Sequence, residues 1–312
     1  MSIDPCNPTT VYVCVPNTSK CTEPDCRGLF RSTNGGKTWT ELGDFLDCKN
    51  IWVDPNDPLH LYQGGGTEDG FHVSYDGGLT WITPPKFKMA GVETGDVYHI
   101  EPDPTDFKHI LVTFHSGWKA YGGDSGILES FDGGENWVVH PPIAPSWSGG
   151  YNVFILHEPI RKIGNSNTWL FATQGEGFFR TTDAGKTWTK VSDIDMEHGG
   201  GTIYYAKDGT LYVSGSQGVL KSKDNGATFE SFVPIPAAGE LSLIGDGTNL
   251  YTGAHGGGKL RYAKETDPTM WMAYNEQEFA EGPFQMALDK VHNVLFTANI
   301  RGGVWVLKLR KE

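Results

Sequence analysis

The chain has 312 residues, of which 38% are hydrophobic, and a formal net charge of −13. This length is enough for one all-β domain with a large core, and no apolar window of about 18 residues is present that would cross a membrane as a helix. The negative charge argues against nucleic-acid binding, because such binding depends on neutralising phosphates. The 41 glycines and 18 prolines are spread along the chain, which favours many short strands joined by tight turns.

One eight-residue pattern recurs five times: Ser or Thr, any residue, Asp or Asn, any residue, Gly, any residue, Thr, and then Trp. The copies are Ser32–Trp39, Ser74–Trp81, Ser130–Trp137 with Asn136 in place of Thr, Thr181–Trp188, and Ser222–Phe229 with Phe in place of Trp. Asn or Asp close to Gly predicts a β-hairpin turn, whose N–H groups the hydroxyl and the Asp or Asn side chain can bind. The aromatic residue is expected to pack between neighbouring repeats. We therefore expect a structural role for the pattern.

Short apolar segments around each copy predict a four-stranded unit, with the repeated turn between its third and fourth strands. In chain order, the predicted first and second strands are Ser2–Asp4 and Thr10–Val15, Asn50–Asp54 and Leu59–Gln63, Val97–Glu101 and His109–Phe114, Val153–His157 and Thr168–Thr173, Gly201–Ala206 and Thr210–Ser214, Glu240–Ile244 and Asn249–Gly253, and Phe284–Asp289 and Asn293–Thr297. The fourth strand of the second unit is predicted at Leu79–Thr83. The last two units lack the repeated turn, and the seventh stops after its third strand. No segment has convincing helical periodicity.

The five copies closely resemble Asp boxes, also called BNR repeats. These are known from sialidases, sortilin-type receptors, xyloglucan hydrolases, polysaccharide lyases and a photosystem assembly factor. The resemblance implies an all-β fold of the sialidase-like superfamily: a single seven-bladed β-propeller over residues 1–312, with a six-bladed ring as the alternative. It says little about activity, because these relatives carry out different chemistry or none.

All five cysteines lie in the first 48 residues. Disulfides are favoured over buried free thiols and over zinc, because the cysteine spacings match no standard zinc pattern. Cys21 and Cys26 could close a small ring, but the pairing is left open. An odd number leaves at least one thiol unpaired within the chain.

We expect a secreted or extracytoplasmic protein. The first residues already read as folded sequence, so we expect its signal peptide to be absent from this sequence. We expect a monomer with carbohydrate as its partner, no nucleic acid and no membrane span. No cofactor or metal is expected to be required. A structural calcium ion stays open, although no ligand loop of recognisable spacing is present.

Candidate site residues follow from the alternating direction of the strands in a blade. The box turns must share one face of the ring with the turns between first and second strands, and the remaining loops must share the box-free face. At the end of the second strand, successive units place a polar side chain near glycine, and in a closed ring these side chains converge around the central opening. They are Gln63, His115, Gln174, Gln217, His255, and Asn299 with Arg301.

Further candidates lie on the other loops and inner strands of the same face. They are Trp118, Lys119 and Tyr121 in the longest loop, Trp147 and His198 in connections between units, and Tyr98, His99 and Gln285 on inner strands. Aromatic faces beside His, Gln, Asn and Arg donors suit a sugar ring, so we expect a glycan site here. The alternative for each residue is a structural role, and His99 in particular could be a satisfied core histidine.

Several reactions are compatible with these residue types. A typical sialidase is disfavoured, because no Arg-Ile-Pro motif is present. A glycoside hydrolase needs two facing carboxyl groups, for which Glu93, Asp96, Asp124, Glu176, Glu197 and Glu281 are candidates. The xyloglucan hydrolases that the chain resembles use two propellers, whereas this chain has one.

The expected enzyme is a lyase or an exo-glycosidase acting on an acidic polysaccharide, and the lyase is preferred. Its base would be His115 or His99, and its acid Tyr98 or Tyr121, with His198 as a further candidate catalytic group. Arg301 or Lys119 would neutralise the substrate carboxylate. A non-catalytic propeller that binds carbohydrate or protein is the alternative.

Overall fold

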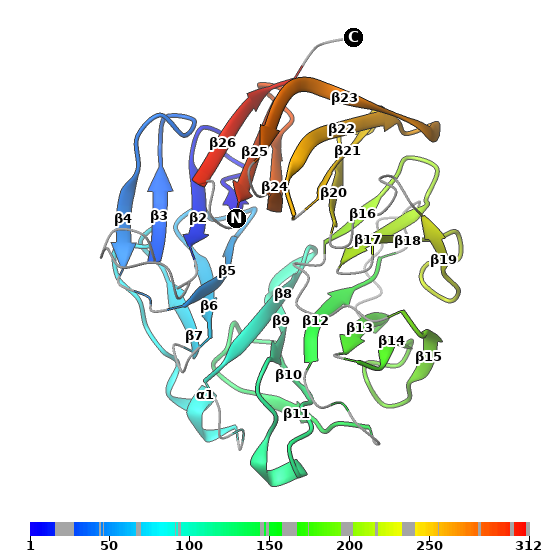
Figure 1. The fold of residues 1–312 in the computed structure, drawn as a ribbon. Helices are drawn as coiled ribbons and strands as arrows, with labels where there is room; N and C mark the ends of the chain where they lie inside the picture. The colour runs from blue at the N-terminus through cyan, green and yellow to red at the C-terminus, as the bar shows by residue number, and fades with distance from the viewer. Residues whose placement is uncertain are drawn as a thin grey trace.

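The computed structural model is a ring of seven antiparallel sheets, the blades of a β-propeller (Figure 1). It describes residues 1–15, 28–43, 45, 47–66, 70–90, 92, 95–143, 147, 150–157, 167–173, 175–194, 202–215, 218–232, 241–254, 256–279, 282–299 and 303–309. The predicted seven-bladed all-β fold is confirmed. Among the described residues, no helix is long and apolar enough to cross a membrane.

Within each blade the strands follow chain order from the centre of the ring outward. The first three blades are β1 (Ser2–Ile3), β2 (Val11–Val15), β3 (Gly28–Ser32) and β4 (Thr40–Gly43); β5 (Cys48–Val53), β6 (Leu61–Gly65) and β7 (Gly70–Ser74); and β8 (Val97–Asp103), β9 (Asp106–Phe114), β10 (Ile127–Ser130) and β11 (Val138–His140). The fourth and fifth blades are β12 (Gly150–Ile155), β13 (Trp169–Thr173), β14 (Gly177–Thr181) and β15 (Thr189–Ser192); and β16 (Ile203–Tyr205), β17 (Leu211–Gly215), β18 (Gly218–Ser222) and β19 (Glu230–Phe232). The last two are β20 (Leu241–Gly245), β21 (Asn249–Ala254), β22 (Gly258–Lys264) and β23 (Asp267–Phe279); and β24 (Pro283–Asp289), β25 (Val294–Asn299) and β26 (Gly303–Lys308).

The second blade departs from the prediction at its outer edge. The expected strand Leu79–Thr83 is reduced to one bridge between Val73 and Ile82. Pro84 and Pro85 follow directly, and proline has no N–H to donate to a sheet. The chain turns there into the short helix α1 (Pro85–Met89), which the sequence analysis did not predict. A single 3₁₀ turn, η2 (Lys119–Tyr121), was also not predicted.

The repeated turns have the hydrogen bonds expected of them. In the second box, the Ser74 hydroxyl donates to Asp76 Oδ1 over 2.8 Å and accepts from the Gly78 N–H over 2.8 Å. The Thr80 N–H donates to the same Oδ1 over 2.9 Å, and the Thr80 hydroxyl donates to Oδ2 over 2.6 Å. These bonds, led by those from Thr80, lower the pKa of Asp76 to about 2. The turn is therefore held by an ionised carboxylate.

The aromatic residue that ends each box packs against the preceding blade. The ring centroids of Trp137 and Phe71 lie 5.3 Å apart, and those of Phe229 and Phe178 lie 5.7 Å apart. Trp39 shares an apolar cluster with Phe296 of the seventh blade. Each box thus links its own blade to the one before it, and the first box links the two ends of the chain.

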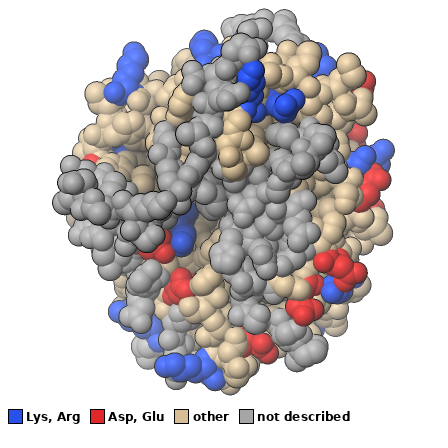
Figure 2. Space-filling model, viewed as in Figure 1, with Lys and Arg blue, Asp and Glu red and all other residues tan. Residues whose placement is uncertain are grey.

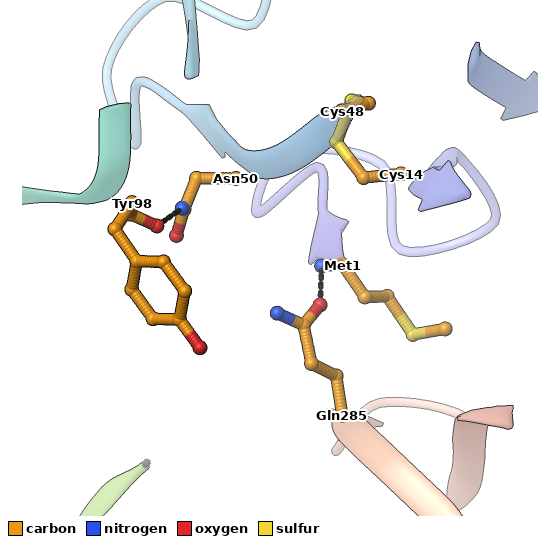
Figure 3. Close-up of a disulfide and its surroundings, with 6 residues drawn as sticks. All are labelled: Met1, Cys14, Cys48, Asn50, Tyr98 and Gln285. Carbon is orange, nitrogen blue, oxygen red and sulfur yellow. Dashed lines mark hydrogen bonds between the residues drawn. A yellow bond between two sulfur atoms is a disulfide. The ribbon is translucent and has the colours of Figure 1, made fainter. Parts of the chain in front are cut away.

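The ring closes between the first and seventh blades by packing rather than by a shared strand. Among the described strands, β1–β4 form one sheet and β24–β26 another. The two blades lie side by side in Figure 1, in blue and red. On the channel side, the amino group of Met1 donates to the side-chain oxygen of Gln285 (Figure 3).

A disulfide joins the first two blades. It connects Cys14 of β2 to Cys48 at the start of β5, and both residues are buried (Figure 3). Cys6 is exposed and has a free thiol. The suggested ring between Cys21 and Cys26 lies outside the described residues and stays a prediction.

Removing the disulfide should weaken the fold without abolishing it. We expect the double variant Cys14→Ser, Cys48→Ser to lose about 2–4 kcal/mol of unfolding free energy, because the cross-link restricts the unfolded chain. Chemical denaturation followed by tryptophan fluorescence measures the loss. Cys6→Ser is the control and should unfold like the wild type. Equal stability of the double variant and the control would contradict the prediction.

Two boxes place a residue other than glycine where the turn needs positive φ. Ala184 has φ 55°, whereas the matching Gly35 in the first box has φ 70°. Because a Cβ is disfavoured in this conformation, Ala184→Gly should raise the unfolding free energy, by up to about 1 kcal/mol. Gly35→Ala should lower it through the backbone alone, because a Cβ at Gly35 would meet no atom within 4 Å. Thermal unfolding of both variants tests the prediction, which fails if the two shifts have the same sign.

Candidate functional site

A cluster of charged and aromatic side chains lies between the second and third blades, at the ends of β5 and β8 that meet the box-free face. We call it the Asp96–His115 cluster; its members are Asp47, Lys49, Asp96, Tyr98 and His115. Asp47 and Lys49 flank Cys48, Asp96 and Tyr98 flank Val97 at the start of β8, and His115 follows β9. Inner strands therefore bring these side chains beside the central opening.

Asp96 is the centre of the cluster. Its Oδ2 lies 3.2 Å from Nδ1 of His115 and accepts a hydrogen bond from the Ser116 hydroxyl over 2.6 Å. Burial tends to raise the pKa of this carboxyl, but hydrogen bonds from His115 and Ser116, with the charges of His115 and Lys49, outweigh burial and lower it. Asp96 is therefore ionised at neutral pH.

The aromatic and cationic members lie beside this pair. The rings of Tyr98 and His115 are stacked, with centroids 6.0 Å apart. Nζ of Lys49 lies 5.9 Å from the centroid of Tyr98 and 3.1 Å from Oδ2 of Asp47. The side chains of His115 and Lys49 are 43% and 31% exposed, so a ligand in solvent can reach both.

Gly66 makes room for the two carboxylates. A Cβ at this position would lie 2.4 Å from Oδ2 of Asp47 and 2.9 Å from Oδ1 of Asp96. Any larger residue would push at least one carboxylate away. On the channel side of the cluster, the amide of Asn50 donates to the carbonyl oxygen of Tyr98 (Figure 3).

The structure brings two of the candidates, Tyr98 and His115, together, but it buries both tryptophans proposed for sugar binding. Trp118 is 0% exposed and packs against Phe114, closing the base of its loop. Trp147 is 1% exposed and packs against Phe171. An indole without exposed surface cannot stack on a sugar in this conformation, so both residues have the role of core residues here.

His99 lies in the interior between the third and fourth blades, apart from the cluster. Its Nδ1 is 2.9 Å from Oδ1 of Asn152, and its Nε2 is 3.3 Å from Oε2 of Glu101. Burial lowers the pKa of His99 to about 3, so the imidazole is neutral. A buried imidazole with both nitrogens engaged is poorly placed to act as a base.

The other candidates are scattered. Gln63 is fully buried in β6, and Asn299 donates to the carbonyl of Gly303 at the end of β25. Lys119 and Tyr121 are exposed on η2. Five candidates lie outside the described residues and stay predictions: Gln174, Gln217, His198, His255 and Arg301.

Sequence reasoning missed Asp47 and Lys49. It began the inner strand of the second blade at Asn50, whereas β5 begins at Cys48. The buried Cys48 was the available signal, because a cysteine that is bonded in the interior extends the strand toward the box-free face. Among the described residues, no group of three or more His, Cys, Asp and Glu side chains could hold a metal ion.

Removing the imidazole of His115 should raise the pKa of the Asp96 carboxyl group. We expect His115→Gln to raise the pKa of Asp96 toward its ordinary value of 3.8, because a hydrogen bond and a neighbouring charge are lost. Carbon-13 NMR titration of the carboxyl measures the shift. Lys119→Gln, a charge removed elsewhere on the loop, serves as control and should leave the titration unchanged. An unchanged titration in His115→Gln would show that the pair does not govern Asp96.

Comparisons with known proteins agree with this fold. The BNR/Asp-box repeat family model matches residues 30–41. An oligoxyloglucan-reducing end-specific xyloglucanase of Emericella nidulans is 24% identical over 234 residues, covering 68% of this chain and 27% of the relative. A xyloglucanase of a Paenibacillus species is 22% identical over 73% of this chain and 26% of its own length. The chain thus spans about a quarter of the length of these curated relatives.

Among solved structures, an ancestral GH74 enzyme superposes with a TM-score of 0.64 at 15% identity, over 89% of this chain and 41% of the enzyme. Identity at this level shows the shared fold alone. Together with the five box turns and the seven blades, these matches identify the chain as an Asp-box β-propeller whose curated relatives act on carbohydrate.

Proposed function

We propose that this chain is a carbohydrate-active propeller of the glycoside-hydrolase type, which holds a glycan against the Asp96–His115 cluster. The main observation that supports this proposal is the cluster itself. It places an ionised carboxylate, an imidazole, an aromatic ring and an ammonium group within reach of solvent at the box-free face. The similarity to xyloglucanases supports a sugar as the ligand.

For hydrolysis, we propose that Asp96 acts as the base. Glycoside hydrolases pair an ionised carboxylate with a protonated carboxyl acid. Asp96 is held ionised, and its orientation is fixed by His115 and Ser116. The other carboxylate of the cluster, Asp47, is paired with Lys49, so it is poorly suited to be the acid. We propose that this propeller forms one wall of a cleft, and that the acid comes from outside the cluster.

Elimination on an acidic polysaccharide fits the cluster less well. Lys49, His115 and Tyr98 are the residue types that a lyase would need. However, a uronate carboxylate at Lys49 would also face Asp47 and Asp96, and like charges at short range repel. On the face presented in Figure 2, Lys and Arg are interspersed with Asp and Glu, and the described residues form no continuous basic patch. An uncharged glycan therefore suits the site better than an acidic one.

A non-catalytic carbohydrate-binding propeller is the second candidate. It is favoured because, in the described cluster, Asp96 is held ionised and Asp47 is paired with Lys49, so neither carboxyl group is placed to act as an acid. Both candidates fit an extracytoplasmic protein, because disulfides such as Cys14–Cys48 persist in oxidising compartments.

Incubation with neutral and uronate-containing glycans separates these functions. We expect binding of a neutral glycan and products that have gained water. Asp96→Asn should lower kcat about a hundredfold while changing affinity little, because proton transfer is lost and the shape is kept. Calorimetry measures binding, and mass and ultraviolet absorbance identify the products.

Gly66→Ala tests whether the cluster is the site. It should weaken binding, because the new methyl group displaces Asp47 and Asp96. Gly256→Ala, in the matching loop of the sixth blade, is the control, because a Cβ there meets no atom within 4 Å. Unsaturated products would indicate a lyase, and binding without any product would indicate a binding module. Failure to bind any glycan would refute the proposal.

A further inference from the structure

The opposite, box-bearing face has two exposed aromatic rings on neighbouring blades. They occupy the second position of the box, between the hydroxyl residue and the Asp. Tyr75 in the second blade is 55% exposed, and Phe131 in the third blade is 61% exposed. The other three boxes have Thr33, Thr182 and Lys223 at this position.

Each ring lies flat on a buried histidine. Tyr75 is stacked on His60 with centroids 4.9 Å apart and planes 14° apart. Phe131 is stacked on His109 at 4.8 Å and 5°. Both histidines immediately precede the residue of the second strand that pairs with the box hydroxyl residue. The two platforms are therefore built in the same way.

Each histidine is itself anchored to the turn between the first and second strands. Nδ1 of His60 lies 3.0 Å from Oδ2 of Asp54, and Nδ1 of His109 lies 3.2 Å from Oδ2 of Asp103. Nε2 of His109 is also 2.8 Å from Oε1 of Glu129. The rings thus rest on fixed supports, so little side-chain entropy remains to be lost when a ligand binds.

The same chain shows that the fold does not need this arrangement. Where the box position is Thr33, Thr182 or Lys223, the position of the histidine is occupied by Thr10, Thr168 or Thr210. Those three blades form complete four-stranded sheets. Aromatic and histidine occur together, and Thr replaces the histidine where the aromatic is missing. The exposed rings are thus an addition to the blade and not a part of its support.

The surroundings of the rings select the ligand. Glu135, of the third box, adds to burial in raising the pKa of Tyr75, so its carboxylate lies near that ring. Asp76 and Asp132 are in the same two turns. Flat apolar faces bordered by carboxylate and amide groups suit a pyranose, whose C–H face stacks while its hydroxyl groups form hydrogen bonds. The three carboxylates outnumber the ammonium group of Lys86, which donates to the amide oxygen of Asn136 in the third box, and so disfavour phosphate and uronate groups.

We propose that Tyr75 and Phe131 form a second glycan-binding surface, which holds a neutral polysaccharide across the second and third blades on the box-bearing face. The choice of a glycan rests on the proposed function of the opposite face. Because the two surfaces lie on opposite faces, a polymer bound here leaves the Asp96–His115 cluster free for a chain end or a second chain.

Replacing both rings by the residue that other boxes use tests this surface. In the full chain, we expect Tyr75→Thr with Phe131→Thr to bind an insoluble neutral β-glucan about tenfold more weakly in a pull-down isotherm. The variant should keep the affinity of the wild type for a short soluble oligosaccharide of the same glucan, which we expect to bind at the Asp96–His115 cluster on the opposite face. Thr33→Ala with Thr182→Ala, on the same face, is the matched control. Thermal unfolding checks that all variants are folded.

The outcomes separate this inference from the proposed function. If the double variant binds the polymer like the wild type, while Gly66→Ala does not, the second surface is refuted and the first stands. If the wild type binds neither polymer nor oligosaccharide, the proposed function is refuted and the second surface with it. An equal loss of oligosaccharide binding in the double variant would also refute a separate surface. If both glycan affinities stay unchanged in the double variant, the glycan surface is refuted, and this is the result that a protein-docking role of the rings would give.

Discussion

The structure depends on a carboxylate or amide that accepts hydrogen bonds from its own turn. In each box, one side-chain oxygen of the Asp or Asn accepts a hydrogen bond from the N–H of the Thr or Asn four residues later. The hydroxyl of the Ser or Thr that begins the box accepts a hydrogen bond from the N–H of the glycine. The turn is thereby fixed in one shape, and the aromatic residue that follows is aimed at the preceding blade. Local polar bonds thus determine where the large apolar contacts of the ring are made.

This ring constrains where function can lie. The inner strands of the blades start on the box-free face, so residues far apart in sequence, such as Met1, Tyr98 and Gln285, lie near one another at the centre of the ring (Figure 3). The disulfide at Cys48 anchors the strand between Asp47 and Lys49. Part of the stability of the fold is therefore located directly beside the candidate site.

The repeated pattern allowed the fold to be predicted, because hairpin turns are encoded within eight residues. Five blades and the packing role of the box aromatics followed from it, and the last two blades, including the three-stranded seventh, followed from apolar strand segments without a box. The site was harder, because burial is set by neighbouring blades. Trp118 and Trp147 belong to a residue type that often stacks on sugars, but both side chains are buried in the core. Asp47 and Lys49 flank Cys48, whose burial was their only signal in the sequence, and Tyr98, which lies beside Lys49, comes from another blade.

Departures from the repeat are the best guide to what the ring does. Selection for folding alone would leave the blades alike, and the first, fourth and fifth blades all lack an aromatic residue at the second box position and have Thr before the second strand. The second and third differ on both faces: they share the Asp96–His115 cluster on one and carry Tyr75 and Phe131 on the other. The second blade is also bonded to its neighbour through Cys48. The other blades fold without these features, so their concentration in two adjacent blades is the observation on which both proposed binding surfaces rest.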